Sequence, residues 1–321
     1  MTRVLVIGAG ALAAGVVLTP AAMALARRTG VVDRPGPLKP QAAPVPYLGG
    51  LAVFVAAVIG AAPSRPSVVA PLAGAMALGT LDDRFDLPPG VRLAGQVAVG
   101  AGVAAVAPTV VHGVGGGVLV CALAVVLMNG VNFLDGLDAL AGGVVLVAGV
   151  AFAALVPGGT RDLATAVAAG VAGFLVYNRP PARVYLGDGG AYLLGAALAV
   201  LLALEWSPTH RRAVSVAAVT FVVLPASEVA FAVVRRLRGR AGVTRGDRRH
   251  PYDLVVARGC SAGRAAFAYV GTEVLLLLAG LWASTLHGVL GPVLVLAAAT
   301  VAVTAGAAAL GALSPGPEVP A

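Results

Sequence analysis

Long apolar stretches, separated by short polar breaks, run along almost the whole chain. The positions of these breaks predict about eleven membrane-spanning helices. They are expected near residues 4–26, 48–63, 67–81, 93–108, 114–131, 139–157, 163–178, 190–206, 213–234, 266–287 and 289–312. The pattern favours an all-α integral membrane protein with one polytopic domain over residues 1–313. The Pro-rich tail at 314–321 is expected to be disordered.

The first apolar run, residues 4–26 behind Arg3, has two interpretations. It could be a cleaved signal, because Ala22–Ala26 resembles a small-residue cleavage site. Signal cores are about 7–15 residues long, whereas this run is long enough to span a membrane. We therefore expect it to be retained as the first helix.

Composition supports a membrane protein and argues against a large water-facing domain. Hydrophobic residues make up 59% of the 321 residues and charged residues only 11%, where a soluble domain has about 25% charged residues. The net charge of +8 could indicate nucleic-acid binding, but the distribution described next favours a topological role. Cys121 and Cys260 offer neither a disulfide framework nor a metal-ligand spacing.

The basic residues gather on one set of alternate connections. Counting from 27–47, one side carries seventeen of the Lys and Arg residues and the other carries five. The positive-inside rule makes the first side cytoplasmic, with the N-terminus outside and the C-terminus inside. The expected cytoplasmic loops, where we also expect the active site, are 27–47, 81–92, 132–138, 179–189 and 235–265.

The acidic residues point to the chemistry. Only 14 Asp and Glu occur, and six of them fall in the segments 81–86, 132–138 and 185–190. Carboxylates at the edge of an apolar medium are costly unless a cation offsets them. The three segments therefore predict a divalent metal ion with a phosphate ligand.

Asp82 and Asp83 end an apolar run, and adjacent carboxylates repel each other unless a cation lies between them. They predict a metal-binding or proton-accepting site for phosphoryl chemistry. The alternative is a helix-end cap or a solvated loop.

Asn129, Asn132, Asp135 and Asp138 recur every three residues and would form one polar stripe on a helix. Such a stripe can hold a polar ligand through bidentate hydrogen bonds. The alternative is hydrogen bonding between helices.

The third segment runs from Asn178 to Gly190. Its glycines would let a ligand approach the backbone at Asp188, and Tyr185 offers an aromatic face. Further along, Glu228 lies within an apolar run and is a functional candidate, with a structural hydrogen bond as the alternative. Lys39, the only lysine, and the arginines of 235–265 could neutralise phosphates.

These segments, in this order, resemble the polyprenyl-phosphate N-acetylhexosamine-1-phosphate transferases, a group within glycosyltransferase family 4. The resemblance covers residues from about 30 to 260. It is carried by Asp33-Arg34-Pro35-Gly36, Pro46-Tyr47-Leu48-Gly49-Gly50, Leu81-Asp82-Asp83-Arg84-Phe85-Asp86, Leu93-Ala94-Gly95-Gln96, the 132–138 stripe and Tyr185-Leu186-Gly187-Asp188. The residues after Asp82-Asp83 are similar to the branch that initiates O-antigen and teichoic acid synthesis.

The resemblance implies a reaction in which a UDP-N-acetylhexosamine and polyprenyl phosphate give a polyprenyl-diphospho-sugar and UMP, with Mg²⁺ (or Mn²⁺) as cofactor. It implies Asp188 as metal ligand and Asp82, Asp83 and His250 as catalytic residues. The nucleotide pocket would be lined by Lys39, Asn132, Asp135, Asp138, Asn178 and Tyr185. The implied location is the plasma membrane, with membrane lipids and the two substrates as partners and no nucleic acid. A homodimer is compatible with these features.

Several positions depart from the family's pattern. His-x-His-His becomes His250-Pro251-Tyr252-Asp253, Arg-Lys-x-His becomes Leu38-Lys39-Pro40-Gln41, Asp-Gly-Leu becomes Asp138-Ala139-Leu140, and Glu228 replaces an Asp. The loss of two histidines removes donors to the diphosphate. A diverged paralogue with another UDP-sugar, or a catalytically silent protein that binds lipid phosphate or nucleotide, are therefore the alternatives. A transporter is least favoured, because the acids cluster on one face.

Overall fold

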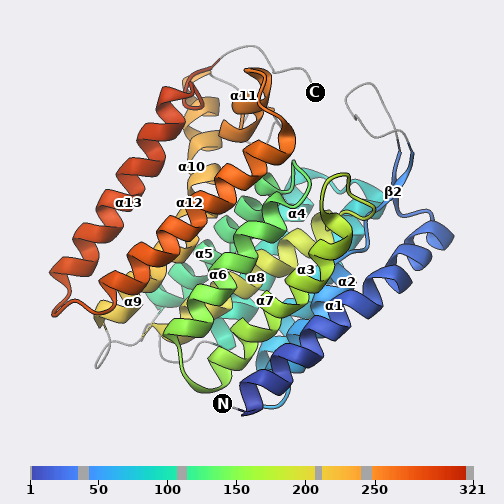
Figure 1. Ribbon diagram of the computed structural model, residues 1–321, viewed down its shortest axis with the longest axis horizontal. Helices are drawn as coiled ribbons and strands as arrows, with labels where there is room; N and C mark the ends of the chain where they lie inside the picture. The colour runs from blue at the N-terminus through green and yellow to red at the C-terminus, as the bar shows by residue number, and fades with distance from the viewer. Residues whose placement is uncertain (1, 35–42, 107–113, 207–211, 240–247, 316–321) are drawn as a thin grey trace.

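The computed structural model describes residues 2–34, 43–106, 114–206, 212–239 and 248–315. These residues form a bundle of helices that cross the molecule from one end to the other (Figure 1). The helices are α1 (Thr2–Thr29), α2 (Gly50–Ala61), η1 (Pro66–Val68), α3 (Val69–Phe85), α4 (Pro89–Val106), α5 (Val114–Leu134), α6 (Leu140–Leu155), α7 (Gly158–Asn178), α8 (Gly187–Glu205), α9 (Arg212–Val219), η2 (Thr220–Val222), α10 (Val223–Arg238), α11 (Pro251–Ala257), α12 (Ala262–Ala283) and α13 (Leu290–Ala309).

The prediction of an all-α membrane protein is confirmed. A helix covers each of the predicted apolar runs, and seven helical stretches of the described residues are long and apolar enough to cross a membrane. Helices α2 and α6 are apolar but shorter. The number of helices that span the membrane and their orientation stay predictions. The expected tail lies largely outside the described residues, which end at Pro315.

One small pair of strands was not predicted. Strands β1 (Val32–Asp33) and β2 (Val45–Pro46) pair antiparallel, with Val32 opposite Pro46. The backbone of Tyr185 donates to the carbonyl of Pro46, so the pair is tied to the loop before α8. Two residues a strand are too few to show an alternating pattern in the sequence.

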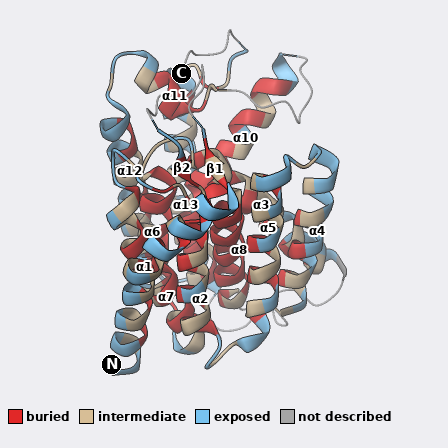
Figure 2. Cartoon of the chain, turned by 90° about the vertical axis from the view of Figure 1, so that its right-hand side faces the viewer, coloured by how far each residue is buried: buried red, intermediate tan, exposed pale blue. Residues whose placement is uncertain are grey.

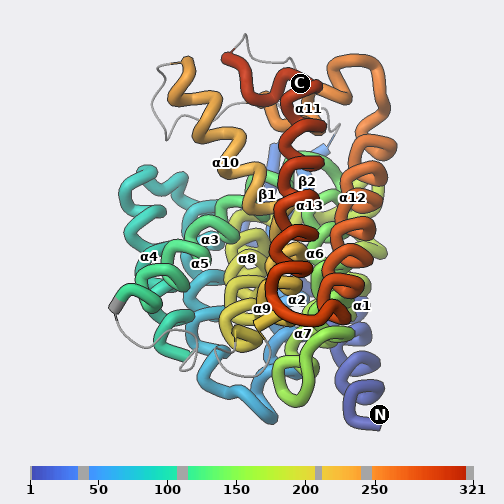
Figure 3. The backbone as a smooth tube through the Cα atoms, turned by 90° about the vertical axis from the view of Figure 1, so that its left-hand side faces the viewer, coloured from blue at the N-terminus to red at the C-terminus, as the bar shows by residue number. Residues whose placement is uncertain are grey.

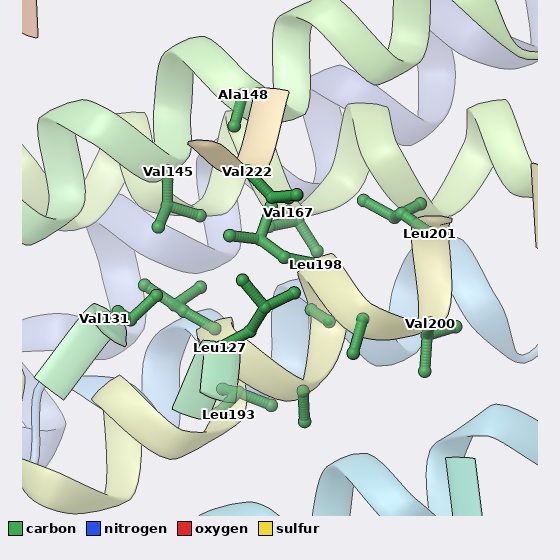
Figure 4. Packing of buried hydrophobic residues seen from close by; sticks show 14 of the residues in the cluster. Leu127, Val131, Val145, Ala148, Val167, Leu193, Leu198, Val200, Leu201 and Val222 are labelled. Carbon is green, nitrogen blue, oxygen red and sulfur yellow. The ribbon is translucent and has the colours of Figure 1, made fainter. Parts of the chain in front are cut away.

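Helix α8 lies at the centre of the bundle and is buried along its length (Figure 2). All its residues are buried except Asp188 and Leu204. Small residues allow this close packing, since a Cβ atom added to Gly79 of α3 would collide with the Asp188 carbonyl. Figure 4 shows the apolar core around this helix, where Leu193 and Leu198 meet Leu127 of α5 and Val167 of α7. The buried helix therefore holds the site residues at its N-terminus on a rigid base.

The apolar run predicted at 213–234 is broken into three pieces. Helix α9 ends at Val219, η2 follows, and α10 leans away from the line of α9 (Figure 3). Pro225, near the start of α10, has no N–H to donate to the preceding turn, which is a common cause of such a break. The break directs α10 toward α11 and α13.

The polar connections gather at the two ends of the bundle. One end collects the β1–β2 pair, the turns between α3 and α4, α5 and α6, and α7 and α8, and helix α11 (Figure 1). At the opposite end, Arg3 of α1 pairs with Asp162 of α7 at 2.8 Å, and Ser64 also donates to Asp162. The described parts of the five loops expected on one side of the membrane thus lie together.

Candidate active site

The N-terminus of α8 is held by Asp83 of α3. The backbone N–H groups of Asp188 and Gly189 donate to the two oxygens of the Asp83 carboxylate, at 3.0 and 3.2 Å. Gly187 precedes them with φ +72°, a conformation that favours glycine, and a Cβ atom there would lie 2.6 Å from Asp83 Oδ2. The sequence Gly187-Asp188-Gly189 therefore lets the helix start directly against Asp83.

Asp188 points toward the other acidic segments. Asn132 Nδ2, near the end of α5, donates to Asp188 Oδ1 at 2.5 Å, and the Asp82 side chain lies beside Asp188. Asp188 is half-buried, unlike its neighbours on α8. Three segments distant in the sequence therefore meet at this carboxylate.

Asp82 is buried and has several donors of its own. Leu87 N donates to Oδ1 at 2.9 Å, while Arg92 of α4 and Tyr192 of α8 donate to Oδ2 at 3.2 and 3.1 Å. Asp82 thus ties α3 to the α3–α4 turn, α4 and α8. The helix-end alternative considered for Asp82 and Asp83 describes Asp82 well, whereas Asp83 is only partly buried.

The predicted four-residue stripe is only partly helical. Helix α5 ends at Leu134, so Asp135 and Asp138 lie in the turn that follows. The stripe prediction is wrong in this respect, because Gly136 weakens the helix and α6 must begin in the opposite direction. Asn129 donates to Gln96 Oε1 of α4 at 2.8 Å, which is the helix–helix alternative.

Asp135 faces the acidic cluster from this turn. The backbone N–H of Gly187 donates to its carboxylate. Burial, followed by the charges of Asp188 and Asp83, raises the pKa of Asp135 well above its ordinary value. A cation among the carboxylates of Asp135, Asp188 and Asp83 would stabilise the charged form of Asp135.

Asp138 and Asn178 connect the loops around the cluster. Asp138 Oδ2 accepts from the backbone N–H of Ala182 at 2.9 Å. Asn178, only 4% exposed, accepts from Ala139 N and donates to the Val184 carbonyl. These hydrogen bonds of Asn178 hold two loops together. Direct contact between Asn178 and a nucleotide stays a prediction.

Ala139 has a strained backbone at the position where the family has glycine. Its φ of +62° lies in the left-handed region, which costs a residue with a Cβ atom about 1–2 kcal/mol. Ala139→Gly is therefore expected to stabilise the fold by roughly 0.5–1 kcal/mol, after the entropy of the unfolded glycine is counted. Thermal unfolding in detergent measures the change.

A matched control for this substitution is Ala148→Gly, in the middle of α6. Ala148 is fully buried and helical, so glycine there is expected to lower the unfolding temperature. An equal fall in unfolding temperature in both variants would contradict the strain at Ala139.

Two tyrosines stand beside the cluster. The rings of Tyr185 and Tyr47 lie 6.0 Å apart at 47°, and the Tyr47 side chain is hydrogen-bonded to Asp33. Burial and the nearby charges of Asp138 and Asp33 raise the pKa of Tyr185 to about 12, so its phenol is neutral at pH 7. Tyr185 was predicted as a site residue, whereas Tyr47 was noted only as part of a motif.

His250 forms a separate buried group next to α5. Its Nδ1 lies 2.7 Å from Glu228 Oε2, and its ring lies 5.0 Å from the ring of Phe133, the neighbour of Asn132. Tyr252 and Asp253, which replace two family histidines, are both buried. Asp253 accepts a hydrogen bond from His250 N at 3.1 Å, so its carboxylate caps the N-terminus of α11.

The sequence analysis did not predict two residues that support the site, Arg92 and Tyr192. Arg92 and Tyr192 both hold Asp82, and Tyr192 could have been found because it follows Asp188 by four residues on α8. Lys39 lies outside the described residues. No group of three or more His, Cys, Asp or Glu with the geometry of a metal site occurs in the described part of the chain.

Comparison with known proteins finds one family model that matches the middle of the chain. The family model for glycosyl transferase family 4 matches residues 66–207, which run from η1 to just beyond α8 and contain Asp82, Asp83, the 132–138 segment and Asp188. This part of the chain, under half of its 321 residues, is similar to glycosyl transferase family 4. His250 and Glu228 lie beyond the matched residues.

Similar proteins match a longer part of the chain. The chain is 27% identical over 284 residues to a probable undecaprenyl-phosphate N-acetylglucosaminyl 1-phosphate transferase of Bacillus subtilis, covering 81% of this chain and 79% of that protein. It is 29% identical over 295 residues to the decaprenyl-phosphate N-acetylglucosaminephosphotransferase of Mycobacterium tuberculosis, covering 75% and 72%. A phospho-N-acetylmuramoyl-pentapeptide-transferase of Symbiobacterium thermophilum is 37% identical over 158 residues, covering 47% and 45%.

Proposed function

We propose that this protein transfers an N-acetylhexosamine 1-phosphate, with N-acetylglucosamine as the expected sugar, from a UDP-sugar to polyprenyl phosphate. The products would be a polyprenyl-diphospho-sugar and UMP. The observation that carries the proposal is the meeting of Asp82, Asp83, Asp135 and Asp188 at one end of an apolar bundle. Asp82 has Arg92 as an ion-pair partner, and the other three have none among the described residues.

The names of the similar proteins support the chemistry. Two of them act on undecaprenyl or decaprenyl phosphate with an N-acetylglucosamine phosphate group. A lipid phosphate is held where the membrane meets water, and the acidic cluster lies at the ends of α3 and α5 and the start of α8. The excess of Lys and Arg on the connections at this end favours the cytoplasmic face of the plasma membrane.

The donor set fits Mg²⁺. This ion takes one or two carboxylates and completes its shell with phosphate oxygens and water, so a site with few protein ligands suits it. Asp188 would hold the ion through Oδ2, since Oδ1 accepts from Asn132. When bound, Mg²⁺ neutralises charge on the phosphates during transfer. Asp135, recessed beside Asp188, would add a second negative charge that favours binding of the cation.

The reaction requires an attack on phosphorus. An oxygen of polyprenyl phosphate forms a bond to the β-phosphorus of the UDP-sugar, and the bond from that phosphorus to the bridging oxygen breaks, releasing UMP. Any proton on the attacking phosphate would pass to Asp83, which is partly exposed and accepts from two backbone N–H groups, while Asp82 is buried and paired with Arg92. Tyr185 would stack on the uracil ring, and His250 would donate to the diphosphate.

Release of UMP tests the proposal. Membranes that contain the protein, supplied with polyprenyl phosphate, Mg²⁺ and radiolabelled UDP-N-acetylglucosamine, are expected to yield labelled lipid and one UMP for each lipid formed. A panel of UDP-sugars then identifies the preferred donor. Membranes without the protein provide the background.

Two outcomes would count against the proposal in different ways. Turnover with another UDP-sugar alone would indicate a diverged paralogue with the same chemistry. No product from any UDP-N-acetylhexosamine, with nucleotide binding intact, would indicate a silent binder of nucleotide or lipid phosphate.

A further inference from the structure

A chain of buried polar groups links three helices behind His250. The Tyr269 hydroxyl of α12 donates to Glu228 Oε1 at 2.9 Å, and Glu228 Oε2 of α10 lies 2.7 Å from His250 Nδ1 at the start of α11. Glu228 is fully buried, and His250 is 5% exposed. Glu228 thus bonds through both of its oxygens, one to a hydroxyl and one to an imidazole.

This arrangement fixes the protonation of the histidine ring. A carboxylate only accepts hydrogen bonds, so the bond to Oε2 requires a proton on His250 Nδ1. The other ring nitrogen, Nε2, has no hydrogen-bond partner in the described part of the chain. Nε2 is therefore the atom left to bind a ligand, and a protonated ring presents a charged N–H there.

The faces of the ring are covered, which restricts its rotation. Tyr252 stacks on His250 with ring centres 5.4 Å apart and planes 7° apart, and Phe133 covers it at 46°. The Tyr252 hydroxyl donates to the Phe133 carbonyl at 2.6 Å, and a Cβ atom added to Gly136 would meet that hydroxyl. The tyrosine that replaces a family histidine thus ties the His250 loop to the turn that carries Asp135.

Burial of the Glu228 carboxylate has an energetic cost. Removing a carboxylate from water costs several kcal/mol, which a hydroxyl and an imidazole offset only when the geometry is good. Within the described part of the chain, the side-chain hydrogen bonds of Glu228 lead to His250 and Tyr269, and none leads to the acidic cluster. Any effect of Glu228 on chemistry must therefore pass through His250.

We propose that Glu228 and Tyr269 are positioning residues, which hold His250 with Nδ1 protonated and Nε2 directed to the diphosphate of the UDP-sugar. This inference rests on the proposed function. Glu228 supplies the negative charge that favours a charged donor at Nε2, and Tyr269 fixes the carboxylate. Tyr252 keeps the ring plane in place beside the α5–α6 turn.

A double-mutant cycle tests the coupling. Glu228→Gln is expected to lower kcat for UMP release about tenfold, and Tyr269→Phe a few-fold, with little change in KM for the UDP-sugar. Glu228→Asp retains a carboxylate and is expected to recover part of the loss. In a His250→Ala background, Glu228→Gln is expected to cost less than twofold.

The control is Tyr177→Phe, which also removes one hydroxyl bond, to the Val16 carbonyl, but has no contact with His250. It is expected to cost the same in both backgrounds. If Glu228→Gln lowers kcat equally with and without His250, the carboxylate acts only on the fold and the proposal is overturned.

The ring protonation provides a readout that does not depend on turnover. The chain has four histidines, so ¹⁵N-histidine spectra can be assigned by comparison with His250→Gln. We expect Nδ1 of His250 to carry a proton, and Glu228→Gln, whose amide donates to Nδ1, to move the proton to Nε2. An unprotonated Nδ1 in the unaltered protein would refute the positioning role. A protein with Nδ1 protonated but no UMP release would instead refute the proposed function.

Discussion

Asp188→Asn is expected to reduce metal-dependent turnover about a thousandfold or more. A metal ion at a phosphoryl-transfer site contributes several kcal/mol, and Asp188 is the carboxylate that all three acidic segments surround. The fold is expected to survive, because the new amide oxygen can still accept from Asn132 and the backbone N–H still donates to Asp83. UMP release over a Mg²⁺ titration measures the effect.

Asp86→Asn is the matched control for this experiment. Asp86 belongs to the same acidic segments but is exposed, and its left-handed backbone, with φ 48°, is tolerated by asparagine. It is expected to retain nearly full activity. A chelator should abolish turnover in both the control and the unaltered protein, and added Mg²⁺ should restore it. Full Mg²⁺-dependent activity in Asp188→Asn would exclude Asp188 as the metal ligand.

Asp83→Asn is expected to lower kcat about a hundredfold or more, with a smaller change in KM for the UDP-sugar. A positioned proton acceptor contributes about 10²–10⁴-fold. The substitution leaves one oxygen to accept from the N-terminus of α8, so a modest fall in unfolding temperature is also expected. Initial rates at saturating lipid phosphate, together with thermal unfolding, separate the two effects.

Asp82→Asn provides the contrast, because Asp82 is buried and holds Leu87 N, Arg92 and Tyr192. Its main effect is expected on stability, since it leaves the Arg92 charge without its partner. If Asp82→Asn kept its unfolding temperature but lost all turnover, and Asp83→Asn kept both, the two aspartates would have to exchange roles.

Much of this protein follows from local sequence. The apolar runs predicted the helices because a chain in lipid must satisfy its backbone hydrogen bonds within each segment. The acidic breaks predicted the site because isolated carboxylates are costly beside an apolar medium. The alternation of basic loops predicted which connections lie together, and their described parts do lie at one end of the bundle (Figure 1).

Other features depended on contacts between distant segments. The three-residue spacing of Asn129 to Asp138 indicated one stripe, yet Asn129 bonds to α4, and the helix ends before Asp135. Spacing alone does not reveal where a helix stops or which neighbour a side chain meets. The same holds for Asp82 and Asp83, which are adjacent in sequence but face different partners.

The sequence by itself determined the membrane class, the approximate helices and the acidic residues of the site, because hydrophobic burial and charge cost act residue by residue. Only the tertiary structure decided how these residues divide their roles. It placed Asp83 at the start of α8 and Asp82 within a buried set of donors. It also showed that Tyr252 and Asp253 support His250, since packing between α5, α10, α11 and α12 determines which atoms remain available to a ligand.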